Sequence, residues 1–296
     1  MLDQSYYEKA DEIIVTIRSM LRSFRIRTYD EDTGFGLLRH VMIRRGYATG
    51  EYMVILVTAD PVFPSKNNFV KALRQRHPEI STVIQNINDK QTGMVLGSRN
   101  VTLYGRGFIE DELCGCRFRI SPSAFYQVNP PQARKLYETA IRYANLSGKE
   151  TVLDTYCGTG TVGIIASSGA GSVTGIELNR DAVRDAVSNA RANNCSNVEF
   201  LTEDSTHYME RLAEAADAKE EGVKVPDVII LDPPRSGTTE AFINAAAHLG
   251  PGRIVYISCD PDTLARDLRL FKKQGYCAKE AQPVDLFPYT EALETV

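Results

Sequence analysis

The sequence has 296 residues, of which 43% are apolar and 24% are charged, ordinary proportions for a globular protein. No apolar run approaches the roughly 20 residues that a membrane-spanning helix needs. The first residues lack the basic head and apolar core of a secretory signal. Six cysteines without the spacing of a disulfide framework indicate reduced thiols. We therefore expect a cytoplasmic protein and exclude a secreted disulfide scaffold.

Charge is distributed unevenly along the chain, whose formal net charge is −4. Residues 1–150 contain 21 Lys and Arg against 16 Asp and Glu, whereas residues 151–296 contain 13 against 22. Such asymmetry permits the first half to hold a polyanion while chemistry takes place in the second. It is consistent with a nucleic-acid partner but does not by itself indicate one.

The first 125 residues read as a strand-rich unit with two helices. Residues 5–24 have apolar side chains at helical spacing, and residues 66–77 form a shorter helix. Two strand-like runs joined by "YATG" predict a hairpin. The predicted strands span residues 36–46, 51–59, 80–89, 101–105, 107–113 and 116–120. We expect residues 1–125 to form a smaller α+β domain.

From residue 126 onward the sequence predicts one helix and then, after residue 150, a strict alternation of strands and helices. A helix over residues 128–146 begins with prolines in its first turn, where the missing N–H does no harm. Five apolar strands follow at residues 151–156, 172–177, 198–203, 227–232 and 253–259. Helical patterns lie between and after them, at residues 160–168, 179–193, 205–217, 239–248 and 260–271. Residues 126–296 therefore predict an α/β domain with a Rossmann-like parallel sheet covered on both faces.

A glycine-rich turn follows the first of these strands, in "VLDTYCGTGTVG" at residues 152–163. Its glycines, Gly158, Gly160 and Gly163, allow a sharp turn into a helix and a close approach of the backbone to a ligand. The GxGxxG pattern alone is weak, because dinucleotide enzymes share it. Carboxylates after the next two strands, Glu177 and Asp204, complete an order that resembles the S-adenosylmethionine-dependent methyltransferases. In that family the three positions face the methionine, ribose and adenine in turn.

Two further strand ends carry candidate reactive groups. The fourth strand ends in "LDPPR", whose prolines fix where the Asp232 carboxylate points. Arg235 follows, suited to a phosphate or a carbonyl-rich base. The fifth strand delivers Cys259 to the same sheet edge, where ligands of open α/β sheets bind. A helix that begins near Pro261 would place its positive end beside the thiol and favour the thiolate. A packing role for this cysteine is the alternative.

Five motifs taken in order carry a more specific resemblance: "FYQVNP", "DTYCGTGTVG", "LDPPR", "SCDPDTLARDL" and "DLFPYTEALETV". Together they resemble the RNA uracil-C5 methyltransferases, which make 5-methyluridine in ribosomal and transfer RNA. The resemblance runs from about residue 5 to the end of the sequence. "TGFGLLRHVMIR" and "VIQNIN" in the first half are more similar to the 23S ribosomal RNA branch. Transfer RNA remains the alternative substrate.

The resemblance implies a reaction and a set of residues. Uracil C5 is a poor nucleophile until a thiolate adds to C6, so Cys259 is implied as the nucleophile and Glu294 as the base that removes the C5 proton. Asp232 would contact the cofactor or orient the uracil, and Arg235 would hold RNA. The positions implied to bind S-adenosylmethionine are Gln127, Tyr156, Gly158, Gly160, Glu177, Asp204 and Asp232.

The sequence also departs from the family. Ala292 stands where relatives have a His before the catalytic Glu, and Cys114-Gly-Cys116 is too close-set for the iron–sulfur cluster of many members. We therefore expect no cluster, and the four histidines are too scattered to hold a metal. The N-terminal β-barrel module of relatives is not found, and the last strand is short, so the chain is interpreted as a fragment or a short form. We expect a monomer without membrane partners. An RNA-binding protein that has lost turnover is the competing class.

Overall fold

The computed structural model describes residues 4–91 and 93–296, which divide into two compact units. Unit 1 comprises Met1–Glu112 with Arg119–Ser123, and unit 2 comprises Leu113–Phe118 with Ala124–Val296. No helix within residues 4–91 and 93–296 is long and apolar enough to cross a membrane.

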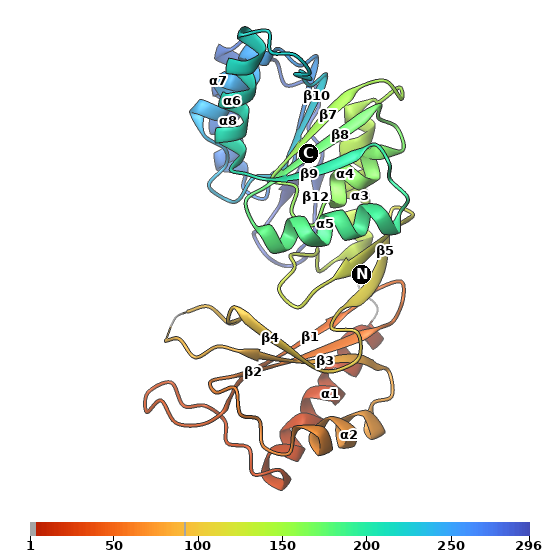
Figure 1. Ribbon diagram of the computed structural model, residues 1–296, viewed down its shortest axis with the longest axis vertical. Coiled ribbons are helices and arrows are strands. Elements are labelled where there is room, and N and C mark those ends of the chain that lie inside the picture. Colours follow the sequence, from red (N-terminus) through yellow and green to blue (C-terminus); the bar gives the residue numbers. More distant parts are fainter. Residues whose placement is uncertain (1–3, 92) are drawn as a thin grey trace. The chain divides into compact units, whose positions relative to one another are not determined.

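Unit 1 is a four-stranded sheet with two helices on one face (Figure 1). The strands lie in the order β1 (Leu38–Arg45), β2 (Tyr52–Thr58), β3 (Ile80–Ile87), β4 (Arg99–Tyr104). The predicted hairpin is confirmed, because β1 and β2 pair antiparallel. β2 and β3 pair in parallel, joined by α2 (Lys66–Arg76), whereas β4 runs antiparallel to β3. Apolar side chains of α1 (Gln4–Ser23) and α2 bury one face of the sheet.

Two short strands, β5 (Ile109–Leu113) and β6 (Cys116–Ile120), form a separate two-stranded sheet. Their tight turn places Cys114 and Gly115 at φ of 52° and 76°. Positive φ at both central residues matches the twist of a two-residue hairpin.

Unit 2 contains the parallel sheet that the alternating pattern predicts. Its order is β11 (Arg253–Tyr256), β10 (Val228–Leu231), β7 (Thr151–Thr155), β8 (Ser172–Glu177), β9 (Val198–Thr202), and every neighbouring pair is parallel. The Rossmann-like fold class is thus confirmed. Because strand side chains alternate between faces, Val152 joins one core cluster and Leu153 the other.

Helices cover both faces of this sheet (Figure 1). α3 (Pro130–Ala144), α4 (Thr161–Ser167) and α5 (Arg180–Ala192) lie on one side. α6 (Ser205–Asp217), α7 (Glu240–Leu249) and α8 (Pro261–Lys273) lie on the other. A last pair of strands, β12 (Pro283–Val284) and β13 (Glu294–Thr295), runs antiparallel beside the end of β11.

Candidate functional site

The candidate site lies where the strands of unit 2 end. β7 lies between β8 and β10; the chain leaves β7 towards β8, whereas it leaves β10 in the opposite direction, towards β11. In open parallel sheets this reversal opens a crevice at the carboxyl ends of the strands. The glycine turn, Asp232 and Cys259 all follow strand ends at this edge.

The glycine turn after β7 is built from left-handed backbone. Tyr156, Gly158 and Gly160 have φ of 61°, 55° and 78°. A Cβ on Gly160 would lie 2.6 Å from the ring carbon Cζ of Phe200, so only glycine fits there. A Cβ on Gly158 would meet nothing within 4 Å, which leaves open space beside its backbone. The glycine sequence and the packing of Gly160 therefore leave the backbone of Gly158 open to a ligand.

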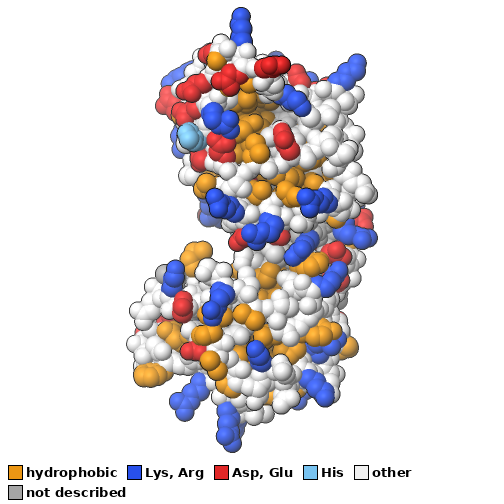
Figure 2. Space-filling model, viewed as in Figure 1, with side chains coloured by type: hydrophobic (Ala, Val, Ile, Leu, Met, Phe, Trp, Pro, Cys, Tyr) orange, Lys and Arg blue, Asp and Glu red, His pale blue; other side chains and the backbone are white. Residues whose placement is uncertain are grey.

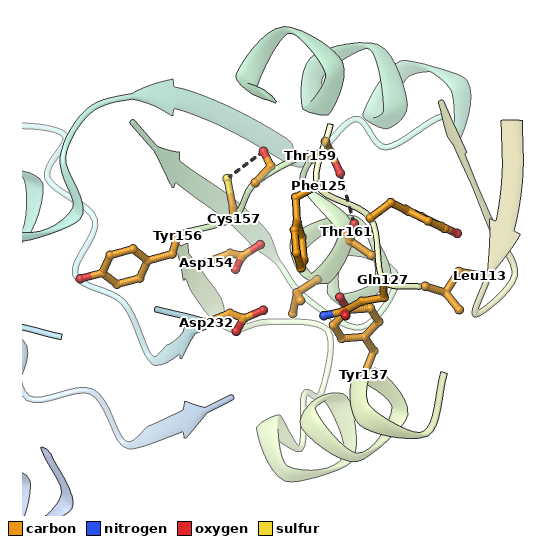
Figure 3. A pocket seen from close by; sticks show the side chains of 13 residues that line it. Leu113, Phe125, Gln127, Tyr137, Asp154, Tyr156, Cys157, Thr159, Thr161 and Asp232 are labelled. Carbon is orange, nitrogen blue, oxygen red and sulfur yellow. Dashed lines mark hydrogen bonds between the residues drawn. The ribbon is translucent and has the colours of Figure 1, made fainter. Parts of the chain in front are cut away.

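A cavity lies beside this turn (Figure 3). The lining residues are Leu113, Phe125, Tyr126, Gln127, Tyr137, Asp154, Tyr156, Cys157, Gly158, Thr159, Thr161, Val162 and Asp232. Two of them are acidic and none is a Lys, Arg or His. The lining therefore favours a ligand that carries positive charge.

The two carboxyl groups of the cavity are held partly protonated near neutral pH. Burial raises the pKa of Asp154 to about 7, although the Gly163 N–H that it accepts at 2.7 Å acts in the opposite direction. Burial raises the pKa of Asp232 to about 8, with a further rise from the charges of Glu294 and Asp154. As the pH rises through about 7 and 8, both carboxyl groups lose their protons and become negatively charged, which favours a cationic ligand.

Gln127, an implied cofactor contact, lines the cavity, where it is buried and hydrogen-bonded to Tyr137. Tyr156 also borders the cavity, but its ring points away from the other side chains (Figure 3). Its hydroxyl lies 2.9 Å from Thr238 Oγ1, and its ring packs against Phe242. Any cofactor contact of Tyr156 would therefore involve its backbone.

Glu177 and Asp204 stand at strand ends but are not among the residues that line the cavity. Glu177 accepts hydrogen bonds from the N–H groups of Gly158 (3.1 Å) and Asn179 (2.8 Å), so it is tied to the glycine turn. Asp204 is the N-cap of α6, where it accepts from the N–H of His207 at 3.0 Å. Their proposed contacts with ribose and adenine remain predictions.

Cys259 and Glu294 are brought together by a backbone bridge. Ser258 and Thr295 exchange two hydrogen bonds, of 2.9 and 2.8 Å, in an antiparallel bridge. Cys259 follows Ser258 and Glu294 precedes Thr295, so the bridge holds the two segments that carry Cys259 and Glu294 side by side. Their charges also act on each other, because Glu294 shifts the pKa of Cys259.

The expectation that Cys259 favours the thiolate is wrong for the protein without ligands. α8 does begin at Pro261, but the pKa of Cys259 is raised. Burial is the main cause, and the carboxylates of Glu294 and Asp232 add to it, whereas Arg235 lowers the pKa. The helix end is also occupied, because the N-cap Asp260 accepts from the N–H of Thr263 at 2.8 Å. Burial and two acidic neighbours, which raise the pKa of Cys259, thus outweigh Arg235.

Glu294 is 6% exposed, and burial raises the pKa of its carboxyl group, opposed by the charge of Arg235. Arg235 itself is exposed on the loop after β10. The structure therefore gathers Cys259, Glu294, Asp232 and Arg235 within electrostatic reach of one another. A thiol at this sheet edge can add to an electron-poor ring, and a carboxylate beside it can remove a proton.

Sequence reasoning left out several lining residues. Asp154, the acidic residue before the glycines, belongs to the order of residues that resembles the methyltransferases, but it is not among the implied cofactor contacts. Phe125, 72% exposed at the cavity, lies within the "FYQVNP" motif. Tyr137 is on α3, and nothing in its local sequence marks it as a site residue. Within residues 4–91 and 93–296, no group of three His, Cys, Asp or Glu is arranged to hold a metal ion.

The strand order β11-β10-β7-β8-β9, with its glycine turn and cavity beside β7, defines a Rossmann-like methyltransferase fold. The chain belongs to the tRNA (uracil-5-)-methyltransferase family, whose model matches residues 98–296. The resemblance found in the sequence motifs is thereby confirmed.

Relatives and solved structures agree with this assignment. An uncharacterized RNA methyltransferase of Clostridium acetobutylicum is 41% identical over 289 residues, which cover 98% of this chain and 61% of the relative. An uncharacterized RNA methyltransferase of Caldanaerobacter subterraneus is 43% identical over 287 residues, which cover 97% of this chain and 62% of the relative. The crystal structure of Pyrococcus abyssi tRNA (uracil-54, C5)-methyltransferase in complex with S-adenosyl-L-homocysteine superposes with a TM-score of 0.78 at 27% identity, covering 97% of this chain and 65% of that one. The chain spans about three fifths of the length of these curated relatives.

Proposed function

We propose that the protein transfers a methyl group from S-adenosylmethionine to C5 of a uracil in RNA. The observation that carries this proposal is the Ser258–Thr295 bridge, which holds the segments of Cys259 and Glu294 side by side, with Glu294 close enough to act on the charge of Cys259. Family membership supports the same reaction. A packing cysteine would need neither an adjacent buried carboxylate nor a position at the ligand-binding edge of the sheet.

The acidic lining of the cavity supports S-adenosylmethionine as its ligand. Open space beside the Gly158 backbone allows close approach of a ligand, and the carboxyl groups of Asp154 and Asp232 suit a sulfonium cation. The P. abyssi relative was solved with the product form of this cofactor, S-adenosyl-L-homocysteine. We assign the cofactor to Gln127, Asp232 and the glycine turn, with Glu177 and Asp204 at its far end.

The residues of the chain then act in order on the uracil. The Cys259 thiolate forms an S–C6 bond, and the electrons of the C5=C6 double bond move to O4 as an enolate. S-adenosylmethionine, when bound, supplies the methyl group that C5 takes, and it leaves as S-adenosylhomocysteine. The Glu294 carboxylate removes the C5 proton, the C5=C6 bond re-forms, and the S–C6 bond breaks to release the thiolate.

Cys259 must lose its proton before it can attack. Its raised pKa means that the free protein holds it mainly as the thiol. Arg235 already opposes that rise, and a cation in the cavity would oppose it further by offsetting the charge of Asp232. We infer that the nucleophile becomes active only once the cofactor is bound.

The RNA is proposed to be 23S ribosomal RNA, on the strength of "TGFGLLRHVMIR" and "VIQNIN" in unit 1. Transfer RNA is the second candidate, because the P. abyssi relative acts on it. Total RNA from a strain that lacks the gene, mapped by mass spectrometry for a missing 5-methyluridine, would distinguish the two. Loss of the modification from transfer RNA alone would overturn the ribosomal assignment.

RNA contact is proposed for unit 1, where Lys and Arg outnumber Asp and Glu on the face shown in Figure 2. Unit 1 also has a groove between α2 and β4. It combines Lys71 and Arg74 with Tyr104, whose ring lies 3.7 Å from the Arg74 guanidinium carbon. Cations beside an aromatic ring suit a phosphate backbone and its bases.

The reaction is tested by trapping its covalent intermediate. RNA with 5-fluorouridine at the target should form a denaturation-resistant complex with the protein, because fluorine cannot leave as a cation. Cys259→Ala should abolish both the complex and methyl transfer while cofactor affinity is kept. A Cys259→Ala protein that still crosslinks or methylates would refute Cys259 as the nucleophile. Cofactor binding without any methyl transfer in the wild type would instead indicate an RNA-binding protein.

A further inference from the structure

A polar network centred on a buried carboxylate joins three separate segments to α8 at the reactive edge of unit 2. We call it the Asp267 network, and its members are Tyr156, Thr238, Tyr256, Arg266 and Asp267. Arg266 and Asp267 lie within the "SCDPDTLARDL" motif, yet the reaction described above uses neither.

Asp267 is the centre of this network. It lies on α8 and is fully buried, with 0% of its surface exposed. One oxygen, Oδ2, accepts from the N–H of Thr238 at 2.9 Å and from the hydroxyl of Tyr256 at 2.7 Å. The other oxygen, Oδ1, accepts from Nε of Arg266 at 2.8 Å. A buried carboxylate is stable only with such partners, so its neighbours are fixed in place.

Arg266 ties α8 to the loop after β10. Its guanidinium donates to the carbonyl oxygens of Ser236 (2.9 Å) and Thr238 (3.1 Å), and it pairs with Asp267. The loop leaves no spare room, because a Cβ on Gly237 would lie 2.5 Å from Asp267 Oδ2. Gly237 also has φ of 72°, which glycine adopts without strain. The backbone of this loop is therefore clamped against one carboxylate and one guanidinium.

The network continues to the cofactor side through Thr238. Its Oγ1 lies 2.9 Å from the hydroxyl of Tyr156, which begins the left-handed turn after β7. Thr238 is 4% exposed, so this contact is shielded from water. In a shielded setting each hydrogen bond is strong and a broken one is costly.

Each joined segment carries a group of the proposed reaction. Tyr156 precedes Gly158 of the cofactor turn by two residues, Thr238 follows Arg235 by three, and Tyr256 precedes Cys259 by three. We propose that Asp267 and Arg266 are positioning residues. They hold the segment that leads from β11 to Cys259, the Asp232–Arg235 loop and the glycine turn after β7 in the relative positions that the reaction needs. This inference rests on the proposed function, because it assumes the Cys259 reaction.

The relative positions of these segments matter because addition to C6 and methyl transfer to C5 need groups from different loops at the same time. A misplacement of about 1 Å in a reacting group can cost about 100-fold in rate. Loss of one network hydrogen bond changes no group that would touch the uracil or the cofactor sulfur. It should therefore slow the chemistry while binding and thiol reactivity are preserved.

The test compares Asp267→Asn with wild type in a single-turnover assay. Protein and S-adenosylmethionine are mixed with transcripts of 23S ribosomal RNA and of transfer RNA made with 5-fluorouridine, and covalent complex is followed on a denaturing gel. We expect Asp267→Asn to form the complex about 10- to 100-fold more slowly, with cofactor Kd within about threefold of wild type. Alkylation of Cys259 by iodoacetamide without RNA, followed on its peptide by mass spectrometry, should be unchanged.

The matched control is Asp111→Asn. Asp111 is also fully buried and accepts a backbone N–H, from Ala48 at 2.7 Å, but it lies in unit 1. It controls for the general effect of neutralising a buried carboxylate, and its rate of complex formation at saturating RNA should stay near that of wild type. Equal slowing in both variants, in proportion to lost thermal stability, would overturn the inference.

Two hydroxyl deletions keep the inference testable if Asp267→Asn does not fold. Tyr256→Phe removes one donor to Asp267, and Tyr156→Phe removes the link to Thr238. Each should slow complex formation about three- to tenfold, and the double variant should be less than additive because both act on one network. Wild-type rates in both variants would refute the positioning role. If wild-type protein traps neither RNA, the proposed function itself fails.

Discussion

Asp154 and Asp232 give the cavity a charge that depends on pH. Their raised pKa values, about 7 and about 8, mean that both carboxyls lose protons between about pH 6 and pH 9. The ionised forms attract the sulfonium of S-adenosylmethionine, whereas S-adenosylhomocysteine has no charge at that sulfur. Affinity for the methyl donor should therefore rise with pH across this range, and affinity for the product should rise less.

Calorimetry at about pH 6, 7, 8 and 9 with both ligands would measure this selectivity. We expect S-adenosylmethionine to bind at least about tenfold more tightly at the highest pH than at the lowest, a difference of about 1.4 kcal/mol in binding free energy. The physical reason is that each ionised carboxylate adds an attraction to the sulfonium. Asp232→Asn should remove much of the dependence near pH 8, the pKa of this carboxyl. A pH-independent ratio of the two affinities would place the sulfonium away from these carboxyls.

Glu294→Gln separates the two halves of the proposed reaction. The amide cannot remove the C5 proton, but the thiol and the cofactor cavity are untouched, so addition and methyl transfer can proceed. Covalent adduct should then accumulate even on ordinary uridine, together with a turnover that is at least about 100-fold slower. A denaturing gel with labelled RNA shows the adduct. Absence of adduct together with lost turnover would mean that Glu294 acts before proton removal.

At the scale of elements, the bridge between Ser258 and Thr295 determines whether nucleophile and base meet. Thr295→Pro removes the N–H that donates to the Ser258 carbonyl, and proline is disfavoured by about 3 kcal/mol or more where a backbone hydrogen bond is needed. We expect this variant to lose the 5-fluorouridine adduct while it keeps cofactor affinity. Thr295→Val keeps the N–H and is the matched control. Equal adduct in both variants would show that the bridge is dispensable.

The glycine turn gives a second test at this scale. Gly160→Ala introduces a Cβ that would meet the Phe200 ring and a residue at φ of 78°, so unfolding free energy should fall by roughly 1–3 kcal/mol. Gly250→Ala is the matched control, because Gly250 has φ of 68° but a Cβ there would meet nothing within 4 Å. Chemical denaturation measures the unfolding free energy of both variants. Gly250→Ala shows the cost of backbone strain alone, and Gly160→Ala shows the cost of strain together with the Phe200 contact. A larger loss for Gly250→Ala would contradict this account of the turn.

Elements were predictable from the sequence because each is encoded locally. Apolar runs, prolines at the first turn of α3 and glycines after β7 are short-range signals, and the structure has the corresponding helices and strands. The contact of Asp267 with Thr238 spans 29 residues, and that of Tyr156 with Thr238 spans 82. Such contacts depend on how the sheet brings strand ends together. The raised pKa of Cys259 is also a tertiary effect, since its acidic neighbours come from other segments.

At the scale of the whole molecule, charge is less polarised than the halves of the sequence indicate. Unit 1 contains 16 Lys and Arg against 14 Asp and Glu, because Arg117, Arg134, Lys135, Arg142 and Lys149 belong to unit 2. RNA affinity should therefore depend on particular cations, such as Lys71, rather than on a uniformly basic surface.

RNA binding should weaken as salt rises, with a slope set by the number of phosphate contacts. Lys71→Ala should reduce the slope of log affinity against log salt by about one and weaken all RNA sequences alike. Fluorescence anisotropy with a labelled uridine-containing loop, between about 50 and 200 mM salt, measures both. Lys224→Ala, on unit 2 before β10, is a control cation. A salt-independent affinity, or a preference for fully paired RNA, would contradict this picture, since the target uridine must leave its stack.

The Ser258–Thr295 bridge also has a consequence for amide hydrogen exchange. Each residue donates its own amide to the carbonyl of the other, so one opening event exposes both amides to solvent. The same opening separates Cys259 from Glu294. Exchange rates at Ser258 and Thr295 should therefore be correlated, and their protection factor gives the fraction of molecules in which nucleophile and base are apart. The assembly of the proposed nucleophile and base can thus be measured in resting protein, without substrate or turnover.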